Sequence, residues 1–133
     1  MFASLLAVTT QDVVLYLHQG FSRVLLLYSA LMAGYGLVLF LRGSNPSGGY
    51  LGALIIAEGV IITQGVIGLL LRAQGTPPHD SLHYLYGVVA VLTLPSAYFL
   101  SSNGTQRKDS LIFAAASLFL IGVAIRGIVT GAS

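Results

Sequence analysis

Residues 50–71 read YLGALIIAEGVIITQGVIGLLL, an apolar run interrupted by a single charged side chain, Glu58. An α-helix rises about 1.5 Å per residue, so about 20 apolar residues can cross the ~30 Å hydrocarbon layer of a bilayer. Every backbone N–H and C=O group must be paired inside lipid, which excludes an isolated strand. The stretch therefore predicts a membrane-spanning helix.

Three further stretches of the same kind lie at residues 13–41, 81–100 and 110–129, separated by polar segments rich in glycine, proline and serine. The chain is 56% hydrophobic and only 8% charged, whereas soluble domains carry roughly 25% charged residues. We expect an all-α, integral membrane up-down four-helix bundle, a single transmembrane domain over residues 1–133. Because the loops are short, helices adjacent in sequence should run antiparallel and pack together.

The loops also predict an orientation. Arg42, Arg107 and Lys108 lie in the first and third loops, and positive residues in short loops stay cytoplasmic. Both termini should then lie on the non-cytoplasmic side. Residues 1–10 carry a short apolar run without a preceding positive region, so they do not resemble a secretory signal peptide.

Small residues indicate how the helices pack, because close helix contact in lipid depends on glycine, alanine and serine. Four pairs share single helix faces: Ala30 with Gly34, Gly48 with Gly52, Ala115 with Gly122, and Gly127 with Gly131. They predict a tight bundle and carry no chemistry of their own.

Most of the ionisable side chains of the spans gather toward one end of the predicted bundle. Arg23 and Arg126 should lie at similar depth on neighbouring helices, with Arg72 slightly nearer the surface. An ionisable group at membrane depth usually faces a partner, a cavity or a ligand, although a long arginine can also extend its head to lipid phosphates. Glu58 lies deeper, as a buried ionisable group that should be protonated or hydrogen-bonded to a neighbouring helix through Tyr35, Tyr98 or Ser117.

The histidines allow a sharper hypothesis. His18 and His83 belong to the first and third spans, which lie diagonally in such a bundle, and two facing imidazoles can ligate a haem iron axially. Gly87, one turn from His83, would leave room for a porphyrin edge. Helical spacing places His18 at least one turn nearer the surface than His83. The alternative is that both histidines hydrogen-bond lipid headgroups or backbone at the interface.

At the level of its four spans, this arrangement resembles the small four-helix membrane b-type cytochromes. The resemblance implies haem b as cofactor, with His18 and His83 as ligands of its iron. The propionates would be one possible anion for Arg23, Arg72 and Arg126. Tyr84 beside His83 could contact a quinone head.

Other classes lack the necessary residues. The chain has no cysteine, no zinc motif and no Ser, His and acid triad spaced for work in the bilayer, so we expect a non-enzymatic protein. With ten charged side chains, nucleic-acid binding is not expected. Our first expectation is an accessory subunit of a larger, energy-transducing membrane assembly, whose partners are lipids and either other membrane subunits or further copies of the chain. The alternative is the single-haem, quinone-reactive cytochrome, a protein of electron transport.

Overall fold

A computed structural model describes residues 10–131 of the chain, so the apolar segment at residues 1–9 lies outside the described part. The described residues form four helices: α2 (Thr10–Leu41), α3 (Gly48–Ala73), α4 (Leu82–Leu100) and α5 (Arg107–Gly131). All four are long and apolar enough to cross a membrane. The four predicted helices are therefore confirmed, each with its ends within about three residues of the predicted ones.

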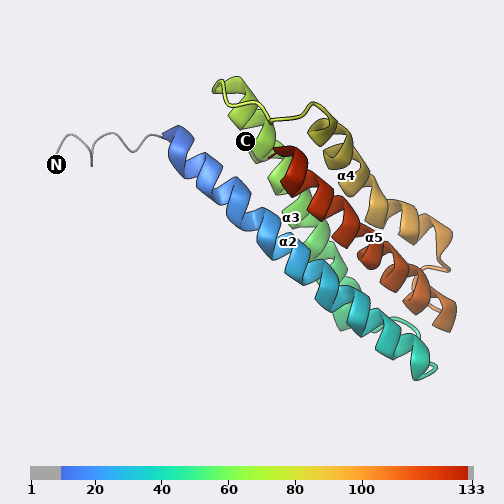
Figure 1. Ribbon diagram of the computed structural model, residues 1–133. Coiled ribbons are helices and arrows are strands. Elements are labelled where there is room, and N and C mark those ends of the chain that lie inside the picture. Colours follow the sequence, from blue (N-terminus) through green and yellow to red (C-terminus); the bar gives the residue numbers. More distant parts are fainter. Residues whose placement is uncertain (1–9, 132–133) are drawn as a thin grey trace.

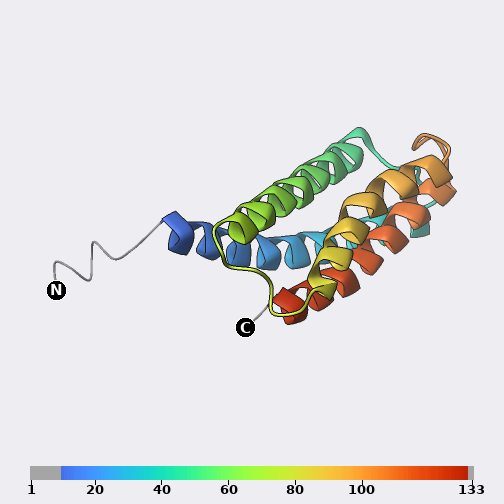
Figure 2. The same ribbon diagram turned by 90° about the horizontal axis from the view of Figure 1, so that it is seen from above.

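The helices alternate in direction, which confirms the up-down-up-down bundle (Figure 1). Helix α2 packs against α3 and α5, and α4 packs mainly against α5. Helices α3 and α4 have the least extensive contact of the neighbouring pairs, and Figure 2 shows α3 set apart from α4 and α5. Helices α2 and α4 are thus diagonal partners, as the sequence predicts for the first and third spans.

Glycines terminate helices α2 and α3. Gly43 and Gly75 adopt left-handed backbone conformations, with φ of 75° and 85°, directly after α2 and α3. The N–H groups of Gly75 and Thr76 then return to the carbonyl groups of Arg72 and Leu71. This 6→1 pattern satisfies carbonyls that a helix end would leave unpaired.

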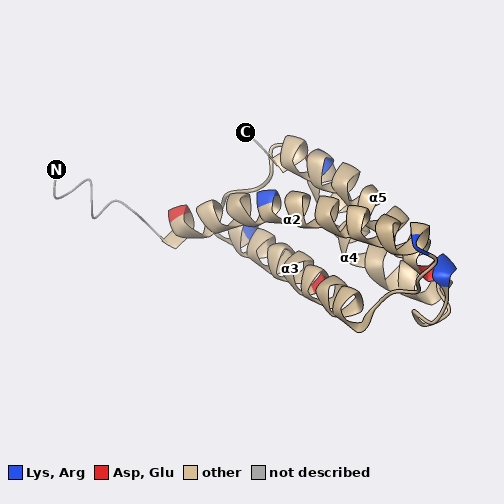
Figure 3. Ribbon diagram, turned by 90° about the horizontal axis from the view of Figure 1, so that it is seen from below, with Lys and Arg blue, Asp and Glu red and all other residues tan. Residues whose placement is uncertain are grey.

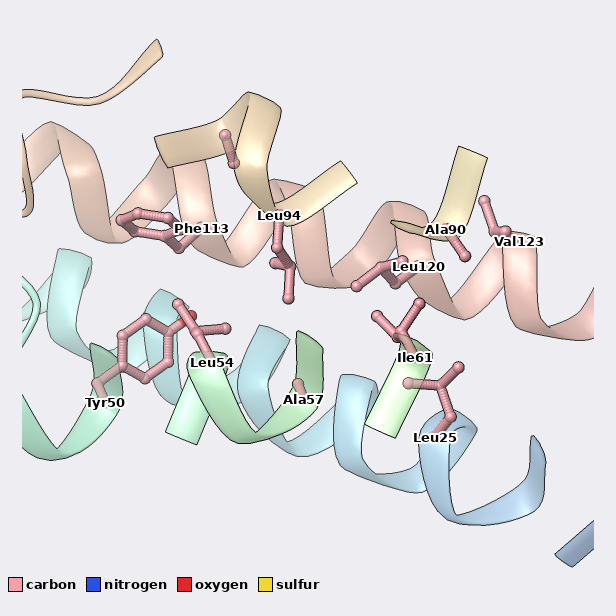
Figure 4. Packing of buried hydrophobic residues seen from close by; sticks show 11 residues of the cluster. Leu25, Tyr50, Leu54, Ala57, Ile61, Ala90, Leu94, Phe113, Leu120 and Val123 are labelled. Atoms are coloured by element: carbon pink, nitrogen blue, oxygen red, sulfur yellow. The ribbon is translucent and has the colours of Figure 1, made fainter. Parts of the chain in front are cut away.

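A layer of apolar side chains fills the centre of the bundle (Figure 4). Every helix contributes, including Leu25 of α2, Ile61 of α3, Leu94 of α4 and Phe113 of α5. The outward faces carry many large apolar side chains as well. Leu31, Ile55 and Phe99 are 68%, 72% and 86% exposed, the arrangement expected where lipid is the solvent.

Among the described glycines, Gly36 of α2 leaves the least room for a side chain. A Cβ atom built there would lie 2.5 Å from Tyr50 Oη and 3.0 Å from both the Ser110 oxygen and Ala114 Cβ. The Tyr50 hydroxyl donates to the carbonyl of Met32 at 2.9 Å, which joins α3 to α2 at the same level. Gly36 is therefore the glycine that lets α2, α3 and α5 meet.

Most of the small residues that were predicted to pack between helices do not contact another helix. Gly34, Gly48, Gly52, Gly122 and Gly127 have nothing within 4 Å of an added Cβ atom, and Ala30 and Ala115 are exposed. Only Gly131 packs against another helix, where it meets His83. Spacing identified residues that share a face, but these helices are apolar on all sides, so it could not identify which face points inward.

Candidate functional site: a histidine pair between diagonal helices

His18 of α2 and His83 of α4 lie against each other inside one end of the bundle. Their ring centroids are 5.9 Å apart and the ring planes form an angle of 67°. The sequence places His18 at least one turn nearer the surface than His83, and in the structure the two rings nevertheless meet. The two histidines thus form a pair of imidazoles contributed by diagonal helices.

The position of His83 is fixed by the last turn of α5. Its Nδ1 atom lies 2.8 Å from the carbonyl oxygen of Gly127 and 3.3 Å from Thr130 Oγ1. A carbonyl oxygen only accepts, so the proton of a neutral His83 ring belongs on Nδ1 and the lone pair on Nε2. The N–H of Asp80 also donates to the Thr130 carbonyl at 2.9 Å, which ties the start of α4 to the same turn.

His18 has a polar neighbour on α3. Gln64 Nε2 donates to the backbone carbonyl of His18 at 2.6 Å. Gln64 Oε1 and His18 Nδ1 are both buried and have no hydrogen-bond partner among the described residues. The amide oxygen can only accept and is the counterpart of an Nδ1 proton on His18. His18 would then also carry its lone pair on Nε2.

The two remaining helices place glycines beside the histidines. A Cβ atom on Gly68 of α3 would lie 3.4 Å from His18 Cε1, and one on Gly131 of α5 would lie 2.8 Å from His83 Cε1. Gly87, the glycine proposed from the sequence, is exposed and has open space around it. The chain contains sixteen glycines, and only the tertiary arrangement reveals that Gly68 and Gly131 flank the imidazoles.

The arginines of this end do not converge on the histidine pair. The Arg72 guanidinium lies 5.4 Å from the centroid of the Tyr84 ring. Arg126 lies 5.7 Å from that of Tyr86, and its Nε donates to the Tyr86 hydroxyl at 3.3 Å. Arg23 is exposed and has no hydrogen bond or ion pair within residues 10–131. Figure 3 shows the basic residues in two zones along the bundle, one toward each end.

The expected hydrogen bond from Glu58 to a neighbouring helix is not formed at its Oε2 atom. Its Oε2 atom is buried without a partner among the described residues. Tyr35 instead stacks on Tyr50, with ring centroids 5.1 Å apart, and the Ser117 hydroxyl is itself buried and unpartnered. Glu58 is about ten residues, or ~15 Å along α3, from Gly68 at the histidine pair.

The histidine pair offers two candidate metal ligands, which are too few for a tetrahedral site built by the protein alone. No group of three or more His, Asp or Glu side chains gathers within residues 10–131, so a tetrahedral site is not assembled there. His79, four residues before His83, is exposed in the loop before α4. Two imidazoles are sufficient for a haem, because the porphyrin supplies the other four ligands.

Comparison with protein-family models, curated proteins and solved structures finds no match for this chain.

Proposed function

We propose that this chain is a small haem-binding membrane subunit, a b-type cytochrome that holds one haem between His18 and His83. The spacing of the imidazoles carries the proposal. A metal–imidazole bond is about 2 Å long and the ring centre lies about 1 Å behind the nitrogen, so two imidazoles on opposite sides of one iron have ring centres about 6 Å apart. The observed separation is 5.9 Å, and axial imidazole planes can be rotated freely about the iron–nitrogen axis.

The partners of the rings support the same proposal. Histidines that bind a metal nearly always donate their second ring N–H to a carbonyl, a carboxylate or water, which fixes the tautomer. Gly127 performs this role for His83 at 2.8 Å, and Gln64 is placed to perform it for His18. Both Nε2 atoms would then be available for iron. Gly68 and Gly131 let α3 and α5 lie directly against the two imidazoles, which a larger side chain at either position would displace.

A second observation favours a role as a subunit of a larger assembly. Glycines such as Gly59 and Gly122 face outward with nothing near them. Small residues on a lipid-facing surface allow another transmembrane helix to approach closely. A single haem at one end of the bundle must also exchange its electrons with another redox centre. We therefore infer a place in a membrane electron-transfer assembly.

The absorption spectrum of the purified protein tests this proposal directly. Dithionite reduction should produce the sharp α-band of a low-spin, six-coordinate b-type haem, at a stoichiometry of one haem per chain. The protein should be expressed with a haem precursor supplied, so that haem supply does not limit loading. A protein that neither carries haem from the membrane nor takes up added haemin would contradict the proposal.

The contribution of Gln64 can be tested separately. Gln64→Leu should retain haem but bind it about 10-fold more weakly, because partners of metal-ligating histidines typically contribute 10–100-fold in metal affinity. The reduction potential of the haem in this variant should shift as well. Haemin titration and redox titration provide the measurements, and Gln64→Glu should restore much of the affinity. Thr63→Ala, which alters only a local bond to Gly59, is the matched control. If Gln64→Leu binds haem with wild-type affinity and reduction potential, Gln64 does not contribute to the site.

We also propose that both termini lie on the non-cytoplasmic side. The native chain lacks cysteine, so single cysteines report accessibility without interference. A cysteine at Thr76 should react with an impermeant reagent in intact cells, whereas one at Ser102 should react only after the membrane is permeabilised. The positive loop residues are the reason for this expectation, and the reverse labelling pattern would invert the topology.

A further inference from the structure

We propose that a groove on the last two turns of α2 binds an anionic phospholipid, with an acyl chain along the groove and the phosphate at Arg42. The groove has a volume of about 300 Å³ and is lined by Gly34, Tyr35, Val38, Leu39 and Arg42. It lies at the end of the bundle away from the histidine pair. The inference is independent of the haem proposal.

The shape of the groove follows from two residues. Gly34 has no side chain, and nothing lies within 4 Å of a Cβ atom added there, so the floor of the groove is open. Tyr35 forms a fixed wall because its ring stacks on Tyr50 at 5.1 Å with an interplanar angle of 21°. Val38 and Leu39 provide apolar surface between this wall and the helix end. Such a channel, running along a transmembrane helix, matches a hydrocarbon chain.

Arg42 closes the groove where α2 ends. Its side chain is exposed and has no hydrogen bond or ion pair among the described residues. Arg107, at the start of α5, lies at the same end, where its Nε donates to the Phe40 carbonyl at 2.7 Å and its guanidinium lies 4.2 Å from the Phe40 ring centroid. Lys108 follows it in sequence. Three cations therefore lie at this end of the bundle.

Within residues 10–131, no acidic side chain neutralises these cations. The nearby acid is Asp109, which is completely buried. Its Oδ1 accepts from the N–H of Ser102 at 2.9 Å and its Oδ2 accepts from that of Gln106 at 3.1 Å. The other three acids are Asp12, Glu58 and Asp80, which lie in the first turn of α2, within α3 and in the loop before α4. Basic residues at a helix end without counter-ions attract anionic headgroups.

The combination of an apolar channel and a cation specifies the ligand. A free phosphate would satisfy Arg42 but leave the channel unfilled. A zwitterionic lipid would bring its own cation close to Arg42 and the neighbouring basic residues, which weakens its attraction. An anionic phospholipid with one negative charge, such as phosphatidylglycerol, satisfies both parts of the groove.

Native mass spectrometry of the full chain in detergent provides the test, with phosphatidylglycerol and phosphatidylcholine added in parallel. We expect the wild type to retain phosphatidylglycerol at least about tenfold better than phosphatidylcholine, a difference that excess inorganic phosphate does not abolish. Arg42→Gln and Gly34→Leu should each lose most of this preference, because they remove the charge and fill the channel. Matched controls are Arg72→Gln, at the other end of the bundle, and Gly20→Leu, an open glycine on the same helix.

Four outcomes would overturn the proposal. The first is equal retention of the two lipids, and the second is wild-type retention of phosphatidylglycerol by either Arg42→Gln or Gly34→Leu. The third is an equal loss in Arg72→Gln, which would indicate attraction by net charge alone. The fourth is loss of all lipid binding to competing inorganic phosphate, which would show that only the anion is recognised. Circular dichroism of Gly34→Leu establishes that the variant is folded, as its open position leads us to expect.

Discussion

Haem binding should disappear when His83 is replaced by alanine, whereas His18→Ala should leave a five-coordinate, high-spin haem with an altered potential. His83 is the better-fixed ligand, because the Gly127 carbonyl at 2.8 Å orients its ring and the last turn of α5 packs against it. His18 depends on one amide that does not yet hydrogen-bond its ring. Axial ligation sets both spin state and potential. Reduced-minus-oxidised spectra and pyridine haemochromogen assays would measure these changes.

The controls for this series lie in the same chain. His79→Ala should bind haem normally, because His79 is exposed in the loop. The double variant His18→Ala, His83→Ala should bind none. Haem retained at full stoichiometry in the double variant would exclude this pair as the ligands, even if the protein proved to be a cytochrome. Circular dichroism should show native helix content in each variant, so that haem loss is not a consequence of unfolding.

The largest effect on stability should come from Gly36→Leu. An added Cβ atom would lie 2.5 Å from the Tyr50 hydroxyl and 3.0 Å from the backbone oxygen of Ser110. The Tyr50 side chain could move only by giving up its hydrogen bond to Met32, and the backbone oxygen can move only with α5. Overpacking of this kind costs about 1–3 kcal/mol, and we expect the upper end of that range because three helices meet here.

Thermal unfolding in detergent, followed by circular dichroism, would measure the loss of stability. Gly20→Leu is the matched control, because it lies on the same helix in open space. It should be neutral or slightly stabilising, since leucine favours helix by several tenths of a kcal/mol over glycine. Equal unfolding temperatures for Gly36→Leu and Gly20→Leu would mean that the close approach of α2, α3 and α5 is not required for the fold.

The sequence was sufficient to predict the helices and their order. Apolar length defines a membrane span almost by itself, and short loops make neighbours antiparallel, which places His18 and His83 on diagonal helices. The rotation of each helix about its axis was not predictable. A span that is apolar on every side carries no periodic signal for its inward face. For this reason the sequence does not single out Gly36, whereas Gly34, two residues away, is predicted to pack but faces outward.

The same limit explains the outcome for the candidate site. Gln64, Gly68 and Gly131 contact the histidines only because α3 and α5 present those faces to the interior. Arg23 and Arg126 lie at the expected depth in sequence but point away from the core, where lipid or a partner can meet them. The depth of a residue along a helix can be counted from residue numbers. The direction in which its side chain points depends on how all four helices pack.

The contacts that orient His83 come from one short stretch of α5. Gly127, Thr130 and Gly131 all lie within residues 127–131. The N–H of Asp80 donates to the Thr130 carbonyl, which is the only backbone hydrogen bond from the loop before α4 to this stretch among the described residues. A local opening of this stretch would release the imidazole while the core around Phe113 and Leu120 stays packed. Ligand release and melting of the bundle would then be two separate events.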